Sequence, residues 1–173
     1  MAVVKRVDRS VPAEASLNLH DARLLLSRSG FLKPPVDVFS LARYLGVVVQ
    51  EEIMDDDISG YLELRAGRWV AGVNSLHHLN RRRFSLAHEL AHFLLHRAQS
   101  QAFRDEVFTR RLGSRNKMEI EADNLAAEIL MPDEFFRESV ASGQRNVSAL
   151  SELFGVSTQA LRFRAQRLGY SVA

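Results

Sequence analysis

The amino-acid sequence predicts an α+β fold that is mainly helical, with a small antiparallel β-sheet and a C-terminal pair of helices that resembles a helix-turn-helix. Two patterns lead to this prediction. Apolar residues recur with helical spacing over most of the chain, whereas residues 47–73 contain β-branched and alternating runs broken by glycine. The 173 residues, 46% of them apolar and 25% charged, suit a globular protein of one domain.

Two helices are expected before this β-rich segment. Residues 13–29 are rich in leucine and precede Gly30, a residue type that favours helix C-termini. Residues 38–45 place apolar side chains at i, i+3, i+4 and i+7, between a predicted N-cap at Asp37 and a glycine at Gly46.

The β-rich segment predicts three strands. Residues 47–49 are β-branched, and residues 60–64 and 68–73 flank the tight-turn pair Ala66-Gly67. The acidic run at residues 55–57 lacks the spacing and the distal glutamate of a calcium loop, so we interpret it as a solvated turn. Two interpretations of these strands are open. An edge strand of such a sheet is able to bind a peptide as an added strand. Alternatively, the strands form an ordinary sheet of the core.

The remainder of the chain predicts helices. Residues 80–96 form a long central helix, and residues 118–131 form a second one with small residues on its apolar face. Pro132 opens a further short helix that ends near Ala141. Residues 97–116 show no clear period and are interpreted as a surface lid or a frayed helix, anchored by Phe103, Val107 and Phe108.

The C-terminal residues 146–169 predict two short helices separated by a turn, which is the pattern of a helix-turn-helix. The turn is Gly155-Val156-Ser157. The side chains expected to point inward are Leu150, Leu153, Leu161, Ala165 and Leu168.

The central helix contains the motif H-E-x-x-H at His88, Glu89 and His92. Two histidines four residues apart lie on one face of a helix, where both are able to bind one metal ion. The chain has no cysteine, so every metal ligand must be His, Asp or Glu. Glu89 is positioned to act as a base on water, which is the chemistry of a metal-dependent peptidase.

A third ligand is expected from outside this motif, and the candidates are His96, Glu119, Glu121, Asp123 and Glu128. His96 lies about 12 Å from His88 along the helix, too far to share the metal, so we place it at the solvent edge or on the substrate side. Glu119 is preferred because it shares a helix face with small residues that permit close packing. Asp123, one turn later, is then expected to accept an N–H from a ligating imidazole.

These motifs resemble those of the ImmA/IrrE family of bacterial and phage metallopeptidases. The resemblance covers residues 37–169 and rests mainly on residues 83–96 and 119–132, the latter similar to the family pattern E-x-E-A-N-x-F-A-A-x-L-L-M-P. The chain departs from that pattern with Asp123 in place of Asn and Leu125 in place of Phe.

The resemblance implies a zincin-like metallopeptidase domain in which His88, His92 and Glu119 bind the metal and Glu89 is the catalytic glutamate. Two histidines and a carboxylate favour Zn²⁺ and also suit Mn²⁺ or Fe²⁺. The family implies a helix-turn-helix repressor or antitoxin as substrate, whose cleavage relieves repression in response to stress, mobile-element or phage signals. Within one domain, we expect a flexible arm at residues 1–12, a catalytic core at residues 13–145 and a C-terminal subdomain at residues 146–169.

Two other functions compete with this one. In the first, residues 146–169 bind DNA directly, with Arg162, Arg164 and Arg167 facing the duplex; the net charge of only +2 gives this little support. In the second, the protein binds metal and sequesters its repressor without cutting it.

The sequence lacks a membrane-spanning run and a signal-peptide pattern, so we expect a cytoplasmic protein with no membrane contact.

Overall fold

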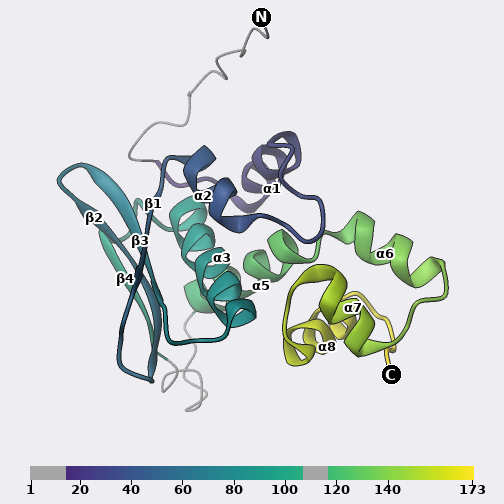
Figure 1. Ribbon diagram of the computed structural model, residues 1–173. Coiled ribbons are helices and arrows are strands. Elements are labelled where there is room, and N and C mark those ends of the chain that lie inside the picture. Colours follow the sequence, from purple (N-terminus) through teal and green to yellow (C-terminus); the bar gives the residue numbers. More distant parts are fainter. Residues whose placement is uncertain (1–14, 107–116) are drawn as a thin grey trace, which may run out of the picture.

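A computed structural model describes residues 15–106 and 117–173. Within these residues the fold is α+β with helices predominating, as predicted (Figure 1). No helix among them is long and apolar enough to cross a membrane. The predicted arm at residues 1–12, and Val107 and Phe108 of the predicted lid, lie outside the described residues.

The helices have the following bounds: α1 (Leu19–Arg28), α2 (Val38–Leu45), α3 (Leu79–Leu95), α5 (Lys117–Leu130), α6 (Asp133–Ala141), α7 (Val147–Phe154) and α8 (Thr158–Arg167). Most of these bounds agree closely with the predicted ones, because the residues that begin and end each helix lie next to it in the sequence. The Asp37 carboxylate accepts the backbone N–H of Ser40 at 3.0 Å, and Gly46 ends α2 in the left-handed conformation.

The sheet contains β1 (Val48–Glu52), β2 (Ile58–Arg65), β3 (Arg68–Asn74) and β4 (Ala102–Glu106), in the order β1-β3-β2-β4. The prediction of an antiparallel sheet is wrong in one respect: β1 pairs with β3 in parallel, so the sheet is mixed. The cause is the hairpin. Ala66 and Gly67 both have positive φ and return the chain as β3, which lies between β2 and β1.

Because β2 and β3 are interior strands, the core-sheet interpretation of these residues is confirmed. The edge strands are β1 and β4. Strand β4 replaces part of the predicted lid or frayed helix, which is therefore wrong for residues 102–106. Buried and exposed side chains alternate in β4, but the sequence does not reveal this alternation. The inward side chain of Asp105 is charged although it is buried, and so is that of its exposed neighbour Arg104.

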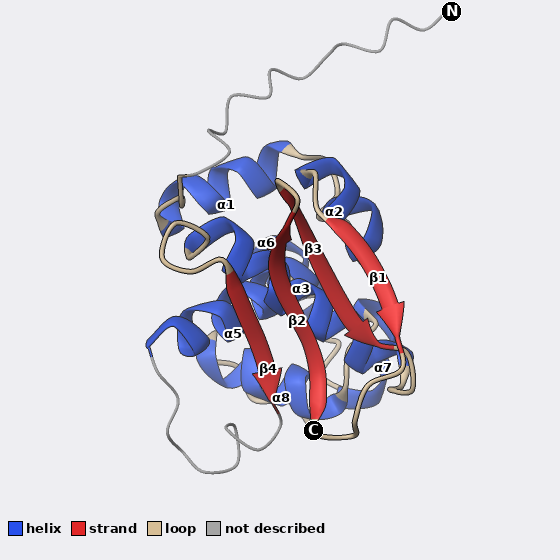
Figure 2. Cartoon of the chain, turned by 90° about the vertical axis from the view of Figure 1, so that its left-hand side faces the viewer, coloured by secondary structure: helices blue, strands red, loops and turns tan. Residues whose placement is uncertain are grey.

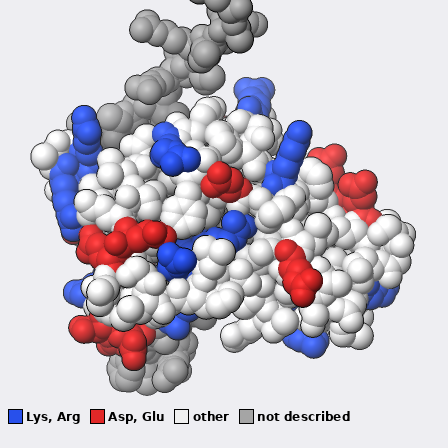
Figure 3. All heavy atoms as spheres, viewed as in Figure 1, with Lys and Arg blue, Asp and Glu red and all other residues white. Residues whose placement is uncertain are grey.

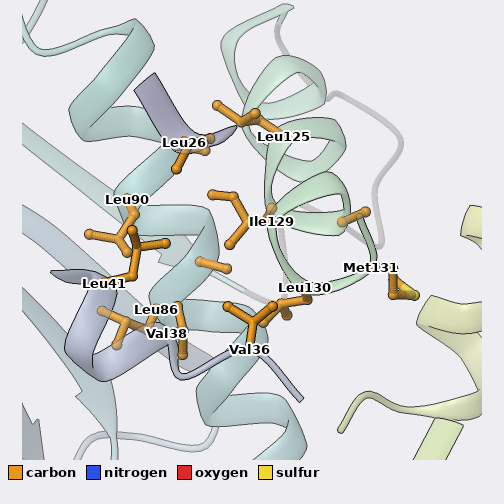
Figure 4. Packing of buried hydrophobic residues seen from close by; sticks show 14 of the residues in the cluster. Leu26, Val36, Val38, Leu41, Leu86, Leu90, Leu125, Ile129, Leu130 and Met131 are labelled. Atoms are coloured by element: carbon orange, nitrogen blue, oxygen red, sulfur yellow. The ribbon is translucent and has the colours of Figure 1, made fainter. Parts of the chain in front are cut away.

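Helix α3 is the centre of the molecule. It lies between the sheet and α5 (Figures 1 and 2), and all its residues from 85 to 95 are buried. Leu86 and Leu90 of α3 belong to one apolar cluster with Leu41 of α2 and Ile129 of α5 (Figure 4). The motif-bearing helix is therefore buried on the side of the sheet and on the side of α5.

The predicted C-terminal helical pair is present as α7 and α8, with Gly155 in the left-handed conformation between them. Leu150, Leu161 and Ala165 are buried as expected, whereas Leu153 is 43% exposed, so its inward placement is wrong. The eight-residue helix α7 presents only one face to the core, and Leu153 lies off that face.

Arg164 does not face solvent, which corrects its predicted DNA-facing position. Its side chain is 4% exposed; Nε donates to the Met131 carbonyl oxygen at 3.1 Å, and the guanidinium pairs with Asp133. Arg162 and Arg167, the other two predicted DNA-facing residues, are exposed. Arg164 therefore fastens α8 to the start of α6.

Replacing Arg164 with Ala should lower the free energy of unfolding by about 1–3 kcal/mol, because the buried Met131 carbonyl loses its donor. Urea denaturation measures this change. The matched variant Arg162→Ala, at an exposed position of the same helix, should stay within about 0.5 kcal/mol of the wild type. Equal stability of the two variants would contradict the anchoring role of Arg164.

Candidate metal centre

Two helices bring the predicted ligands together. His88 and His92 lie one turn apart on α3, and their Nε2 atoms are 3.0 Å from each other. Glu119, in the first turn of α5, places Oε2 at 3.2 Å from Nε2 of His88 and Oε1 at 3.3 Å from Nε2 of His92. Both histidines are almost fully buried, so three donor atoms converge at one point inside the molecule.

The separations of these atoms fit a metal ion. Ligands bound at about 2.0–2.1 Å in a tetrahedral arrangement lie about 3.3 Å from one another, close to the 3.0–3.3 Å found here. Two imidazole nitrogens and a carboxylate oxygen are also the donor types that zinc accepts in hydrolytic sites. The residues present therefore fit a divalent metal.

The other candidate ligands make different contacts. Glu128 pairs with Arg23, with oxygen and nitrogen 2.6 Å apart. Asp123 accepts a hydrogen bond from His88 Nδ1 at 2.9 Å and is 7% exposed, which is the contact predicted for it. Its influence on a bound metal stays a prediction.

Glu89 is fully buried beside the first histidine, and strand β2 passes close to its carboxylate. A Cβ atom on Gly60 would lie 3.3 Å from Glu89 Oε1 and only 2.7 Å from the Gly72 carbonyl oxygen. Glycine at position 60 therefore lets the sheet approach Glu89. A glycine inside a predicted strand was the sequence signal for this close approach.

Asp105 is a residue of the site that sequence reasoning missed. Its carboxylate lies in a group with His88 and Glu89 whose donor atoms are all within 4.8 Å of one another, and the residue is 3% exposed. Asp105 was overlooked because strand β4 was not predicted. An acidic residue in a short strand with charged neighbours has no periodic signal of its own.

His96 is not at the solvent edge, so that part of its prediction is wrong, whereas its place on the substrate side stays a prediction. It is 1% exposed, its Nδ1 lies 3.0 Å from His92 Nδ1, and its Nε2 lies 3.0 Å from Glu121 Oε2. Phe103 of β4 stacks on His92 with ring centroids 4.5 Å apart and also lies beside His96. Strand β4, which was not predicted, thus covers the C-terminal end of α3, and the sequence of that helix alone predicts an exposed end.

This geometry agrees with a comparison of the sequence with protein families. Residues 42–166 match the family model of peptidases described as the IrrE N-terminal-like domain. The chain belongs to this family. A search of curated proteins finds no match to it. The IrrE N-terminal-like family is one of metallopeptidases, and His88, His92 and Glu119 lie close enough together to hold a metal ion.

The side chains of the three candidate ligands have shifted pKa values. Burial lowers the pKa of His88, but its hydrogen bonds with Asp123 and Glu119 outweigh burial and raise that pKa to about 10. Burial also lowers the pKa of His92, and the nearby His88 charge adds to the effect. Burial raises the pKa of Glu119, yet hydrogen bonds from both histidines outweigh it and hold the pKa well below its ordinary value. In the metal-free protein near neutral pH, His88 is therefore protonated and Glu119 is ionised.

Replacing Glu119 with Ala should weaken zinc binding by more than about 100-fold. Loss of a residue that only hydrogen-bonds to a metal ligand weakens metal binding by about 10–100-fold, and loss of a ligand itself should cost more. Competition with a chromophoric chelator measures the affinity. Zinc at 100 times its dissociation constant should also stabilise the wild type by about 2.7 kcal/mol, reversed by excess chelator. The control Glu134→Ala, exposed on α6, should bind zinc like the wild type; the same affinity in Glu119→Ala would reject Glu119 as a ligand.

Zinc binding at pH 7 should release about one proton from His88, because its Nε2 must be deprotonated to bind a metal and its pKa is raised to about 10. Calorimetric titrations in buffers with different ionisation enthalpies count the released protons. The number should fall as the pH approaches 10, where the His88 proton is already leaving. Release of no proton at pH 7 would contradict this assignment.

Proposed function

We propose that this chain is a zinc-dependent endopeptidase that hydrolyses a peptide bond in a helix-turn-helix repressor or antitoxin. The observation that supports the peptidase chemistry is the convergence of His88, His92 and Glu119 beside the buried Glu89. The substrate class is taken from the family that the sequence resembles. Cleavage in the cytoplasm would then relieve repression in response to stress, mobile-element or phage signals.

In this proposal, His88, His92 and Glu119 hold the ion, with Mn²⁺ or Fe²⁺ as alternatives to Zn²⁺. A bound zinc ion supplies Lewis-acid polarisation and lowers the pKa of water. The Glu89 carboxylate accepts a proton from the attacking water as its oxygen adds to the scissile carbonyl carbon. The same proton passes to the amide nitrogen as the C–N bond breaks, so Glu89 is regenerated.

The neighbouring residues support these roles. Asp123 accepts the Nδ1–H of His88 at 2.9 Å, and this fixes the ring so that Nε2 faces Glu119. Burial of Glu89 and His88 removes competing water and strengthens local electrostatic interactions. The base Glu89 is thus held in a buried position beside His88.

Strand β4 is the part of the sheet best placed to receive substrate. It is an edge strand, its Phe103 stacks on His92, and its Asp105 lies beside Glu89. An extended peptide added to that edge would run next to the metal centre. An exposed, extended segment of the partner repressor is therefore the form of substrate that we expect.

Direct DNA binding is less well supported. One of its three arginines, Arg164, is buried in contacts with Met131 and Asp133. On the face seen in Figure 3, basic and acidic side chains of the described residues are interspersed. A nucleic-acid-binding surface needs clustered positive charge instead.

Replacing Glu89 with Gln should leave zinc bound and reduce repressor cleavage by about 10²–10⁴-fold, because the proton acceptor is lost. The assay incubates the protein with the purified repressor encoded beside it and Zn²⁺, with mass spectrometry of the products. Wild type and the exposed-site control Glu134→Gln should give the same fragments, and a chelator should abolish them.

The same variant separates cleavage from sequestration. If Glu89→Gln relieves repression in cells as well as the wild type does, the protein acts by binding its repressor and peptidase chemistry is not the mechanism. Absence of any chelator-sensitive fragment from the wild type would overturn the proposed activity.

A further inference from the structure

The two histidines of the motif are supported in different ways. His88 donates directly to a carboxylate, since its Nδ1 lies 2.9 Å from Asp123. Nδ1 of His92 meets another imidazole instead, at 3.0 Å from His96 Nδ1. The far nitrogen of His96 then reaches Glu121 at 3.0 Å. His92 is thus connected to a carboxylate through a third histidine.

Proton positions in this chain of groups are constrained by metal binding. A metal-bound imidazole nitrogen has no proton, so a neutral His92 that binds through Nε2 must carry its proton on Nδ1. The contact between the two Nδ1 atoms then requires His96 Nδ1 to be an acceptor without a proton. A neutral His96 therefore carries its proton on Nε2, facing Glu121, and an ionised carboxylate there accepts it.

We propose that His96 and Glu121 form a relay that positions His92 for metal binding. Glu121 keeps the His96 proton on Nε2, so His96 Nδ1 accepts the N–H of His92 and leaves His92 Nε2 free to face Glu119. This inference rests on the proposed metal centre and assigns it two positioning residues. Neither residue touches the metal or the reacting atoms.

Burial supports a specific role for His96 over that of a solvated side chain. His96 is 1% exposed, and the ring of Phe103 covers it from β4. The Glu121 side chain is 40% exposed and is approached on its outer side by Lys117, at 3.6 Å. The relay thus runs from the buried centre to a carboxylate at the surface.

The relay also explains the spacing of acidic residues on α5. Glu119 contacts both motif histidines, Asp123 contacts His88, and Glu121 contacts His96. Three carboxylates on one helix therefore serve three histidines spaced four residues apart on another. Under the proposal, Glu121 and His96 are one functional pair.

Zinc affinity of the full chain, measured by chelator competition, tests the relay. His96→Leu removes the acceptor for His92 and should weaken binding by about 10–100-fold, and Glu121→Ala should weaken it by about 10-fold. His96→Asn keeps an acceptor oxygen near the position of Nδ1 and should recover part of the loss. The control Lys117→Ala removes the outer partner of Glu121 and should leave zinc affinity unchanged.

A spectroscopic measurement separates positioning from a general loss of structure. Long-range ¹H–¹⁵N spectra of the zinc-loaded wild type should show His92 protonated on Nδ1 and His96 on Nε2 only. In Glu121→Ala, the His96 tautomer preference should weaken while the metal-free unfolding midpoint changes little, because Glu121 is partly exposed. This variant keeps the test valid if His96→Leu does not fold.

The outcomes distinguish the relay from the metal site itself. If the wild type binds zinc and both His96→Leu and Glu121→Ala bind it equally well, the relay is wrong and the metal centre stands. A doubly protonated His96 in the zinc-loaded protein also rejects the relay. If the wild type binds neither zinc nor Mn²⁺, the metal centre is rejected and the relay with it.

Discussion

Close packing of α3 against α5 is the constraint on which the site depends. Alanines lie buried on both helices, at Ala87 and Ala91 of α3 and at Ala122 and Ala126 of α5. Small side chains allow two helix backbones to approach, and the acidic residues of α5 then reach the histidines of α3. A larger residue at this interface would separate the Glu119 carboxylate from the two histidine Nε2 atoms, which lie only 3.2–3.3 Å from it.

The first turns of α3 orient it relative to the rest of the fold. Three consecutive arginines in these turns each contact a different element: Arg81 donates to Ser59, Arg82 pairs with Glu51, and Arg83 donates to the Gly155 carbonyl oxygen. Exposed pairs of this kind contribute little to stability. Arg83 is partly buried, which lowers its pKa, and it joins α3 to the end of α7.

Local signals made much of this fold predictable. The caps of α2, the turn at Ala66-Gly67 and the helical period of α3 depend on residues close in the sequence. The cluster of His88, His92 and Glu119 was predictable for a related reason, since helical spacing decides which of the acidic residues shares a face with small residues. Its roles in metal binding and catalysis stay predictions.

Errors arose where burial depends on distant chain segments. His96 and Arg164 are polar residues that a single helix would expose, but Phe103 covers the first and the start of α6 receives the second. The parallel pairing of β1 with β3 likewise follows from where the hairpin inserts, which no local pattern encodes. Sequence reasoning therefore predicted which residues of α3 and α5 lie together better than it predicted which segments cover them.

Helix α3 supplies both apolar side chains of the core and buried polar side chains. Ser85, His88, Glu89 and His92 are all buried in the stretch that also supplies the apolar core, and burying ionisable groups destabilises a protein unless they are paired. Carboxylates of α5 provide part of that pairing. Glu119 and Asp123 of α5, together with Glu89 and Asp105, surround His88 with carboxylates, and a divalent cation bound there would offset their negative charge. The metal that the chemistry requires is thus expected to stabilise the α3–α5 interface as well, because a site assembled only in the folded chain couples metal binding to folding.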